Sequence, residues 1–179
     1  MPMALSATIY KANISLSNLS HNHYEDYSLT MAMHPSENEQ RMMKRLLCFL
    51  LNASENLEFT RGLSTTEEPE IWERSLTGEI LHWIEMGEPT LKRIKQAQGK
   101  ARQVSVYTFN TNTYQEWFEK LKAKLSFKNL AIYYISNESN IELDSLCKKS
   151  MQLSCTIEDD SMYLSSDDVM ISLKVEKLK

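Results

Sequence analysis

The chain has 179 residues, of which 42% are hydrophobic and 25% are charged, and its formal net charge is −4. This charge excludes a chain that is basic throughout and built to bind phosphate, and its four glycines and four prolines are too few for a collagen-like or low-complexity protein. No stretch of about 18 apolar residues occurs, so no membrane span is expected. We expect one domain over residues 1–179, and three cysteines without C-x-x-C spacing predict reduced thiols in a cytoplasmic protein.

The N-terminal part of the sequence predicts a β-hairpin followed by a helix. Residues 4–19 alternate between apolar and polar side chains, as a strand does, and after a polar turn residues 24–33 read as a returning strand. Ser36 and Glu39 have the spacing of a capping box, in which the serine caps the helix and the glutamate bonds back to it. We therefore expect Ser36 to start a helix that runs to about Ala53.

Strands and helices alternate through the rest of the chain. Further strands are predicted at residues 57–61, 79–86, 104–109, 131–135, 151–157, 161–164 and 169–175. Helices are predicted at residues 91–98, 111–124 and 141–149, with Gly99 as the C-terminal cap of the first. Residues 62–78 have no clear period and are expected to be irregular.

This order of elements predicts an α/β fold. Strand–helix alternation in the middle of the chain favours parallel pairing there, because a parallel neighbour needs a crossover connection. Adjacent strands at the two ends favour antiparallel hairpins. The expected architecture is therefore a mixed β-sheet flanked by helices, with added β-hairpins.

Two glutamates mark the candidate site. They lie in the stretch 62–99, which holds six of the eight glycines and prolines. Glu70 follows Pro69, and Glu85 ends an otherwise apolar strand on the same face as Trp83. A carboxylate on such a face must be solvated, paired or bound to a metal. If the two converge, they offer hard oxygen ligands to Mg²⁺ or Mn²⁺, which can orient water against a phosphodiester; the alternative is a salt-bridged or rim carboxylate.

In PD-(D/E)XK nucleases one metal ligand is the acid of a proline–acid pair, and the next is an acid at a strand end that follows a glycine turn. The same order occurs in this stretch. A lysine two residues after the second acid normally completes that motif, but Gly87 stands there. The positive charge must then come from elsewhere. Arg93 on the following helix is a candidate, because its guanidinium can neutralise carboxylates or hold a phosphate. The alternative for Arg93 is a position on a solvated helix face.

Six segments spread along the chain carry a more specific pattern. They are residues 4–12, 34–37 with 41–43, 59–62, 68–70 with Trp72, 83–85 with Gly87 and Pro89, and 93–95 with Ala97. By these segments the chain resembles the YaeQ family from about Met3 onward. The resemblance implies a compact α/β fold that is a variant of the PD-(D/E)XK nuclease core, in a family without an established biochemical activity.

The resemblance also implies residue roles. Glu37, on the first helix, resembles the helical acid of the nuclease core. Glu70 takes the place of the aspartate of the proline–aspartate pair, and Glu85 takes the place of the second acid. Arg93 stands near a displaced lysine. Relatives often carry a lysine where this chain has Gln96.

We therefore expect a divalent-metal-dependent or degenerate nuclease-like protein that acts on nucleic acid. Glu70 and Glu85 would bind Mg²⁺ or Mn²⁺, Glu37 would support the site, and Arg93 would stabilise phosphate charge. The alternative is a non-catalytic binding or regulatory protein that retains the nuclease-like fold. Gln96, Gly87 and the acidic net charge favour this alternative.

Overall fold

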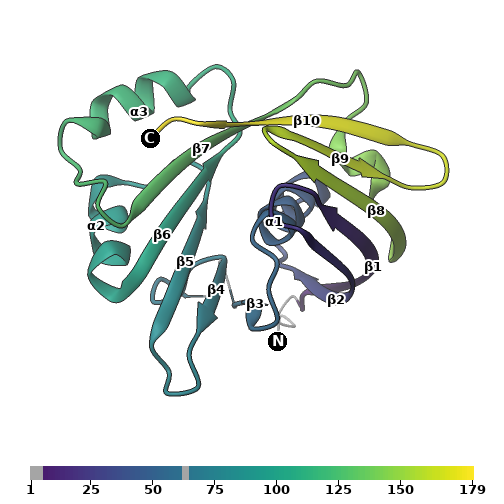
Figure 1. Ribbon diagram of the computed structural model, residues 1–179, viewed down its shortest axis with the longest axis horizontal. Helices are drawn as coiled ribbons and strands as arrows, with labels where there is room; N and C mark the ends of the chain where they lie inside the picture. Colours follow the sequence, from purple (N-terminus) through teal and green to yellow (C-terminus); the bar gives the residue numbers. More distant parts are fainter. Residues whose placement is uncertain (1–5, 62–64) are drawn as a thin grey trace, which may run out of the picture. The chain divides into compact units, whose positions relative to one another are not determined.

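A computed structural model describes residues 6–61 and 65–179, and the chain forms two compact units (Figure 1). The first unit comprises Met1–Leu51 and Asn137–Lys174, and the second comprises Asn52–Ser136 and Val175–Lys179. Strands outnumber helices in both, so the fold is mixed α/β with few helices. The expected strand start at residues 4–5 and part of the expected irregular segment, residues 62–64, lie outside the described residues.

The first unit contains strands in the order β2-β1-β8-β9-β10. The predicted N-terminal hairpin is confirmed, because β1 (Thr8–Asn18) pairs with β2 (His23–Met33) in antiparallel register. On its other side, β1 pairs in parallel with β8 (Ser150–Glu158). Antiparallel pairing then continues through β9 (Ser161–Ser165) to β10 (Met170–Lys177).

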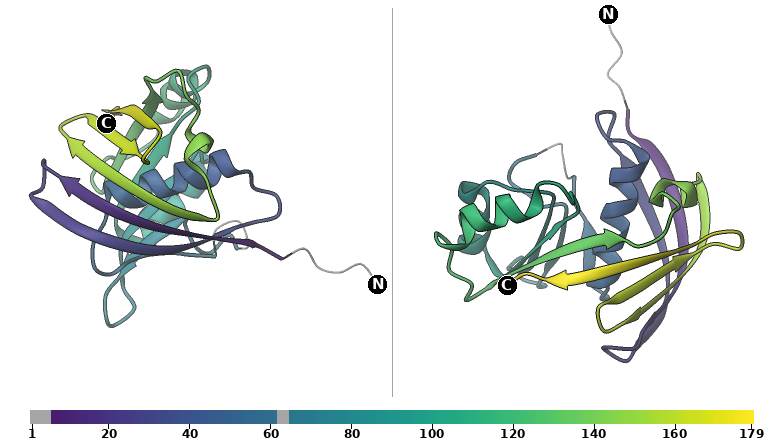
Figure 2. Two further views of the ribbon diagram at one scale, coloured as in Figure 1. Left: turned by 90° about the vertical axis from the view of Figure 1, so that its right-hand side faces the viewer. Right: turned by 90° about the horizontal axis from the view of Figure 1, so that it is seen from above.

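Helix α1 (Glu39–Leu51) lies over one face of this sheet (Figure 2). Strand β1 alternates strictly toward it, with Ala12, Ile14 and Leu16 buried and the residues between them pointing away. The helix contributes a wide buried face that includes Met42. Full burial of a leucine, isoleucine or methionine side chain stabilises the fold by roughly 1.5–3 kcal/mol. The core of the first unit therefore lies between α1 and one face of the sheet.

The start of α1 differs from the prediction. Ser36 does not cap the helix; its hydroxyl lies 2.7 Å from Nδ1 of His34. Instead the side chain of Asn38 accepts the backbone N–H of Arg41 at 2.8 Å, which is the N-cap bond. The capping-box prediction was wrong by two residues, because Asn38 offers an equally good cap and the turn before it is engaged by the side chain of Glu37.

The second unit contains strands in the order β7-β6-β5-β4-β3. Their bounds are β3 Leu57–Phe59, β4 Ile71–Arg74, β5 Ile80–Met86, β6 Ala101–Thr108 and β7 Leu130–Asn137. The predicted parallel pairing is confirmed for β5 with β6 and for β6 with β7. The prediction missed β4, which pairs antiparallel with both β3 and β5. The chain end also joins this unit, since Leu178 donates its backbone N–H to Ile132 in β7.

Helices α2 (Leu91–Lys100) and α3 (Tyr114–Lys122) belong to the second unit and pack on its apolar core (Figure 1). That core consists of Trp83, Ile94, Ala97, Ala101, Val104, Val106, Leu130 and Ile132. Thr90 caps α2 by accepting the backbone N–H of Arg93. Gly99 lies inside α2 rather than after it, because the helix leads directly into β6 and leaves no loop for a left-handed cap.

The predicted helix at residues 141–149 is only the short 3-10 helix η2 (Leu143–Leu146). Two of its residues, Leu143 and Leu146, are buried, and β8 begins soon afterwards at Ser150. Strand β8 pairs with β1, and this pairing already includes Lys149, whose carbonyl accepts the backbone N–H of Lys11. The residues that lead into β8 are therefore extended and not helical. No helix in the parts of the chain that the structure describes has the length and apolar character to cross a membrane.

Candidate functional site

Strand β5 places Glu85 on the face of the sheet that α2 covers. Parallel pairing sets Trp83 beside Val104 and Glu85 beside Val106, and these neighbours belong to the core under α2. The side chain of Glu85 is therefore buried, with 7% of the residue exposed. A buried carboxylate needs hydrogen-bond donors or a positive charge in its immediate surroundings.

Arg93 and Trp83 provide both, and they act on the same carboxylate oxygen. Oε1 of Glu85 accepts the indole N–H of Trp83 at 2.9 Å and the Nε–H of Arg93 at 2.9 Å, and Nη2 of Arg93 lies 2.8 Å away. The guanidinium carbon of Arg93 lies 5.1 Å from the centre of the Trp83 ring, within the range of a cation–π contact. The arginine that the sequence assigned to the site thus pairs with one of the two acids.

The rest of the Arg93 guanidinium binds the segment 65–68, which precedes β4. Nη2 donates to the carbonyl of Glu68 at 2.7 Å, and Nη1 donates to the carbonyl of Thr66. Lys100, at the end of α2, adds an ion pair with Glu67 at 2.8 Å. One guanidinium therefore joins α2, β5 and the segment 65–68, and a phosphate would have to displace some of these protein acceptors to bind it.

Glu70 lies beside Glu85. It immediately precedes β4, and its backbone N–H donates to the carbonyl of Ile84 at 3.2 Å. Only 8% of Glu70 is exposed. The next residue, Ile71, pairs with Ile84, so Glu70 lies across from Glu85 in the antiparallel register, and its negative charge adds to the raised pKa of Glu85. The structure thus brings together Glu70, Glu85 and Arg93.

Burial is the main influence on the charge of Glu85. It raises the pKa of the carboxyl above the ordinary value, and the nearby charge of Glu70 acts in the same direction. Arg93 and the indole N–H of Trp83 oppose this rise, because both stabilise the ionised form. The positive charge of Arg93 and the indole dipole of Trp83 thus offset part of the cost of burying the ionised carboxylate.

The positions at which a lysine would complete the nuclease motif carry no charge. Gly87 has a φ of +96°, a conformation that favours glycine, and its backbone N–H donates to Tyr107. Gln96 is half-buried on α2, one turn from Arg93, so it shares a face with it. Lys92 and Lys95 on the same helix are exposed. Arg93 is therefore the cation that reaches Glu85.

Glu37 belongs to the first unit, where it has a different set of partners. Its carboxylate binds the guanidinium groups of Arg41 and Arg45, the latter with a separation of 2.9 Å, and accepts the backbone N–H of His34 at 3.3 Å. Arg45 also donates to the carbonyl of Ala32 in β2. These bonds tie the entrance of α1 to the sheet of its own unit.

His82, on the same strand as Glu85, is half-buried and hydrogen-bonded. Its Nε2 lies 2.7 Å from the hydroxyl of Ser105, which is itself buried. Burial lowers the pKa of His82 from 6.5 to about 4. The imidazole is thus neutral at physiological pH and does not add a positive charge to the site.

Trp83 and the backbone carbonyls of the segment 65–68 were not predicted to belong to the site. The signal for Trp83 was present, because residues two apart on a strand share a face and an indole N–H is a good donor to a carboxylate. The carbonyls had no signal, because any residue can supply one. Among the described residues, no group of three or more His, Cys, Asp or Glu side chains has the arrangement of a metal site.

Comparison with known proteins gives a consistent result. The sequence model of the family described as YaeQ protein matches residues 3–175. The chain is 42% identical over 166 residues to "Uncharacterized protein YaeQ" of Escherichia coli (strain K12), covering 92% of each chain. It is 41% identical over 164 residues to the protein of the same name from Salmonella typhi, covering 91% of each.

Solved structures of similar sequence share the fold. The crystal structure of YaeQ protein from Xanthomonas axonopodis pv. citri superposes with a TM-score of 0.89 at 32% identity, covering 97% of this chain and 99% of the other. The crystal structure of YaeQ protein from Pseudomonas syringae superposes with a TM-score of 0.87 at 29% identity, covering 97% and 96%. Both matches extend over nearly the whole chain.

Proposed function

The chain belongs to the YaeQ family, and from the geometry of its buried acids we propose that it is a nuclease-like protein that holds a divalent cation at Glu70 and Glu85 and acts on nucleic acid. The observation that carries the proposal is the approach of two buried carboxylates from neighbouring segments of one sheet. Their order in the chain, with Pro69 before Glu70, supports a variant of the PD-(D/E)XK core.

The donor set fits Mg²⁺ or Mn²⁺ by its chemistry. Mg²⁺ is commonly held by one or two carboxylates, with water and substrate phosphate completing its shell, and Glu70 with Glu85 would provide that pair. Such an ion, when bound, polarises a phosphoryl oxygen and activates water. Arg93 would share the carboxylate of Glu85 with the ion, and as the neighbouring fixed positive charge it is suited to phosphate. Glu37, engaged by Arg41 and Arg45, is not needed for this arrangement.

The second candidate function is a non-catalytic binding or regulatory protein that retains this architecture. The observation in its favour is the bonding of Arg93, whose three nitrogens all reach protein acceptors. The glycine at position 87 and the glutamine at position 96 support it further, because neither can supply the charge of a catalytic lysine. In this case the Glu85–Arg93 pair is a structural ion pair.

Isothermal titration with Mn²⁺ and Mg²⁺ tests the proposal, followed by incubation of the same samples with DNA and RNA. We expect binding by the wild type, and loss of binding in Glu70→Gln and in Glu85→Gln. Glu73→Gln, on the neighbouring strand, is the matched control and should bind normally. Cation binding that is absent, or indifferent to both substitutions, would remove the metal from the proposal.

The nucleic-acid arm separates the two candidates. Cleavage that depends on the cation and disappears in Glu70→Gln and Glu85→Gln supports the nuclease-like function. Salt-dependent retention on DNA or RNA without cleavage supports the non-catalytic binding protein, because contacts to phosphate weaken as salt rises. Absence of both cleavage and retention would exclude nucleic acid as the ligand for either function.

A further inference from the structure

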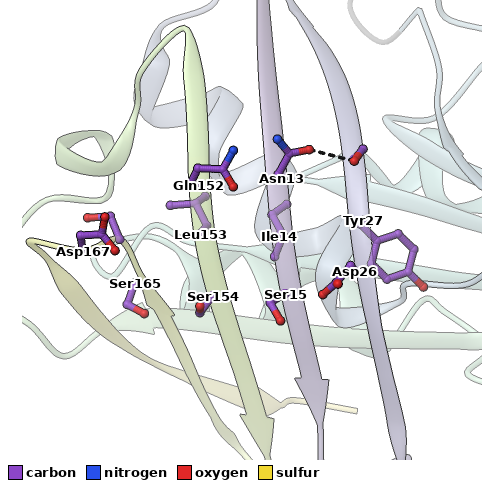
Figure 3. Close-up of a pocket in the computed structure, with 12 residues that line it drawn as sticks. Asn13, Ile14, Ser15, Asp26, Tyr27, Gln152, Leu153, Ser154, Ser165 and Asp167 are labelled. Atoms are coloured by element: carbon purple, nitrogen blue, oxygen red, sulfur yellow. Dashed lines mark hydrogen bonds between the residues drawn. The ribbon is translucent and has the colours of Figure 1, made fainter.

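A polar groove of about 520 Å³ lies on the first unit, far along the sequence from Glu70 and Glu85 (Figure 3). It crosses strands β2, β1, β8 and β9 and extends to the turn after β9. Its volume is within the range of small-molecule sites. Most of the side chains that line it carry hydroxyl, amide or carboxylate groups, among them Asn13, Ser15, Asp26, Gln152, Ser154 and Asp167, although Ile14 and Leu153 also belong to the lining.

The strand register arranges these groups in a row. Ser15 lies opposite Asp26 on one side and Ser154 on the other, and Ser154 lies opposite Ser165. Figure 3 shows the row running from Asp26 across the serines to Ser165, with Asp167 beyond it. Three strand spacings separate the outer members, which is about 14 Å. The groove is thus an extended trough with serines as its floor and a carboxylate near each end.

A second row on the same face adds aromatic side chains. Tyr24 pairs with Ser17, Ser17 with Thr156 and Thr156 with Tyr163, two residues along each strand from the first row. Tyr24 is 58% exposed and Tyr163 is 38% exposed. The two residues between them, Ser17 and Thr156, have smaller side chains. A tyrosine combines an apolar ring with a polar hydroxyl, and this combination suits an exposed tyrosine to contact with a ligand.

The face of this sheet opposite α1 is hydrophilic. Sheets made only of parallel strands are generally buried on both faces, whereas sheets with antiparallel strands commonly have one solvated face. Here α1 covers one face of the parallel pair β1–β8, while the other face carries exposed polar residues such as Lys11, Asn13 and Gln152. Polar side chains are therefore available for contacts on this face of the first unit.

The chemistry of the groove selects among ligand classes. None of the described residues that line it is Lys, Arg or His, and two are aspartates, so an anionic ligand such as a nucleic acid has no partner there. The hydroxyl and amide floor does not favour an apolar ligand. Serine, asparagine and glutamine side chains each both donate and accept hydrogen bonds, and a carboxylate accepts up to four. This set matches a ligand with many hydroxyl groups.

We propose that this groove binds a neutral oligosaccharide lying across the strands, with its hydroxyls bonded to Asp26, Asn13 and Gln152 and its sugar faces against Tyr24 and Tyr163. The side chain of Asn13 is already oriented, because its Oδ1 accepts the hydroxyl of Ser28 at 2.8 Å, which directs its Nδ2 hydrogens elsewhere. All the groove residues belong to the first unit. The site is therefore independent of the function proposed for Glu70 and Glu85 in the second unit.

Nuclear magnetic resonance titration of the full chain tests the proposal, with maltotriose, cellotriose and chitotriose as probes. We expect at least one to shift the side-chain amide signals of Asn13 and Gln152 in a saturable manner. Binding should be insensitive to salt, because the ligand carries no charge. Ser154→Trp should abolish binding by filling the floor, and Asp26→Asn should weaken it about tenfold, since a hydrogen bond to a charged group is among the stronger ones.

The double substitution Tyr24→Ala with Tyr163→Ala should also weaken binding, and these exposed positions should leave the melting temperature unchanged. Thr30→Ala, on the same face of β2 but outside the groove, is the matched control and should bind as the wild type does. Three results would overturn the proposal. The first is the absence of a saturable shift with all three saccharides, and the second is unchanged affinity in the Asp26 and tyrosine variants. The third is salt-sensitive binding of spermidine in place of the saccharides, because it would indicate a site for cations.

Discussion

The buried imidazole of His82 makes a specific prediction about stability and pH. In the folded chain its pKa is lowered from 6.5 to about 4, because burial disfavours the charged form. Between these values the unfolded chain binds a proton at His82 and the folded chain does not. The contribution of His82 to stability is therefore complete above pH 6.5 and is lost as the pH falls toward 4.

The size of this loss follows from the two pKa values. Each pKa unit corresponds to 1.36 kcal/mol, so the free energy of unfolding should fall by about 1.4 kcal/mol at pH 5.5 and by about 3 kcal/mol near pH 4. Other groups titrate over the same range, and the buried carboxyl of Glu85, with its raised pKa, acts in the opposite direction. The measurement must therefore be a difference between two proteins that share those groups.

The variant His82→Gln supplies that difference, because a glutamine can still bond to Ser105 but does not titrate. Urea denaturation of both proteins at several pH values between 7.5 and 4 gives the two stability curves. We expect the wild type to lose stability relative to His82→Gln by the amounts above. An equivalent substitution of the exposed His21 should leave the curve of the wild type unchanged. Parallel curves for the wild type and His82→Gln would refute the reasoning.

Three further predictions test other parts of the structure. Arg93→Met leaves the buried carboxylate of Glu85 without its cation and should lower the free energy of unfolding, measured in urea, by about 3–5 kcal/mol. Adding Glu85→Leu to this variant should recover much of the loss. Full stability of Arg93→Met alone would contradict the pairing. Trp83→Phe removes one hydrogen bond to Glu85 and should cost about 1–3 kcal/mol by the same measurement, and a smaller change would show that water replaces the indole. Asn38→Ala should lower the free energy of unfolding by about 1 kcal/mol because the helix cap is lost, whereas Ser36→Ala should have little effect. A larger loss in Ser36→Ala than in Asn38→Ala would show that Ser36 caps the helix.

Strands and helices with strong periodic patterns were predictable from the sequence. The N-terminal hairpin, the helix α2 and the parallel strands β5, β6 and β7 all lie where apolar residues recur with the appropriate period. Strand β4 was missed because its four residues include Glu73 and Arg74 and follow a proline-containing segment, so no alternation is visible. Its place in the sheet comes from pairing with β3 and β5, which no local pattern records.

Only part of the candidate site was predictable. The fold brings Glu70, Glu85 and Arg93 together, whereas Glu37 binds Arg41 and Arg45 in the first unit. The sequence grouped all four residues in one site. It did not indicate that Arg93 also binds the carbonyls of Thr66 and Glu68, because backbone acceptors have no sequence signature. The functional roles of these residues, as ligands of a cation or of phosphate, stay predictions that the titrations above test.

The parallel pairing of β1 with β8 has a consequence for the order of folding. It joins residues as distant in the sequence as Lys11 and Ser150, whereas the second unit is made mostly from the continuous segment Asn52–Ser136. During synthesis, β1, β2 and α1 therefore leave the ribosome well before their partner strand exists. Pairings of such long sequence separation form slowly, and the open edge of β1 is exposed to other chains in the interval. The second unit can thus form its hydrophobic core first, whereas the sheet of the first unit is completed only after β8 has been synthesised.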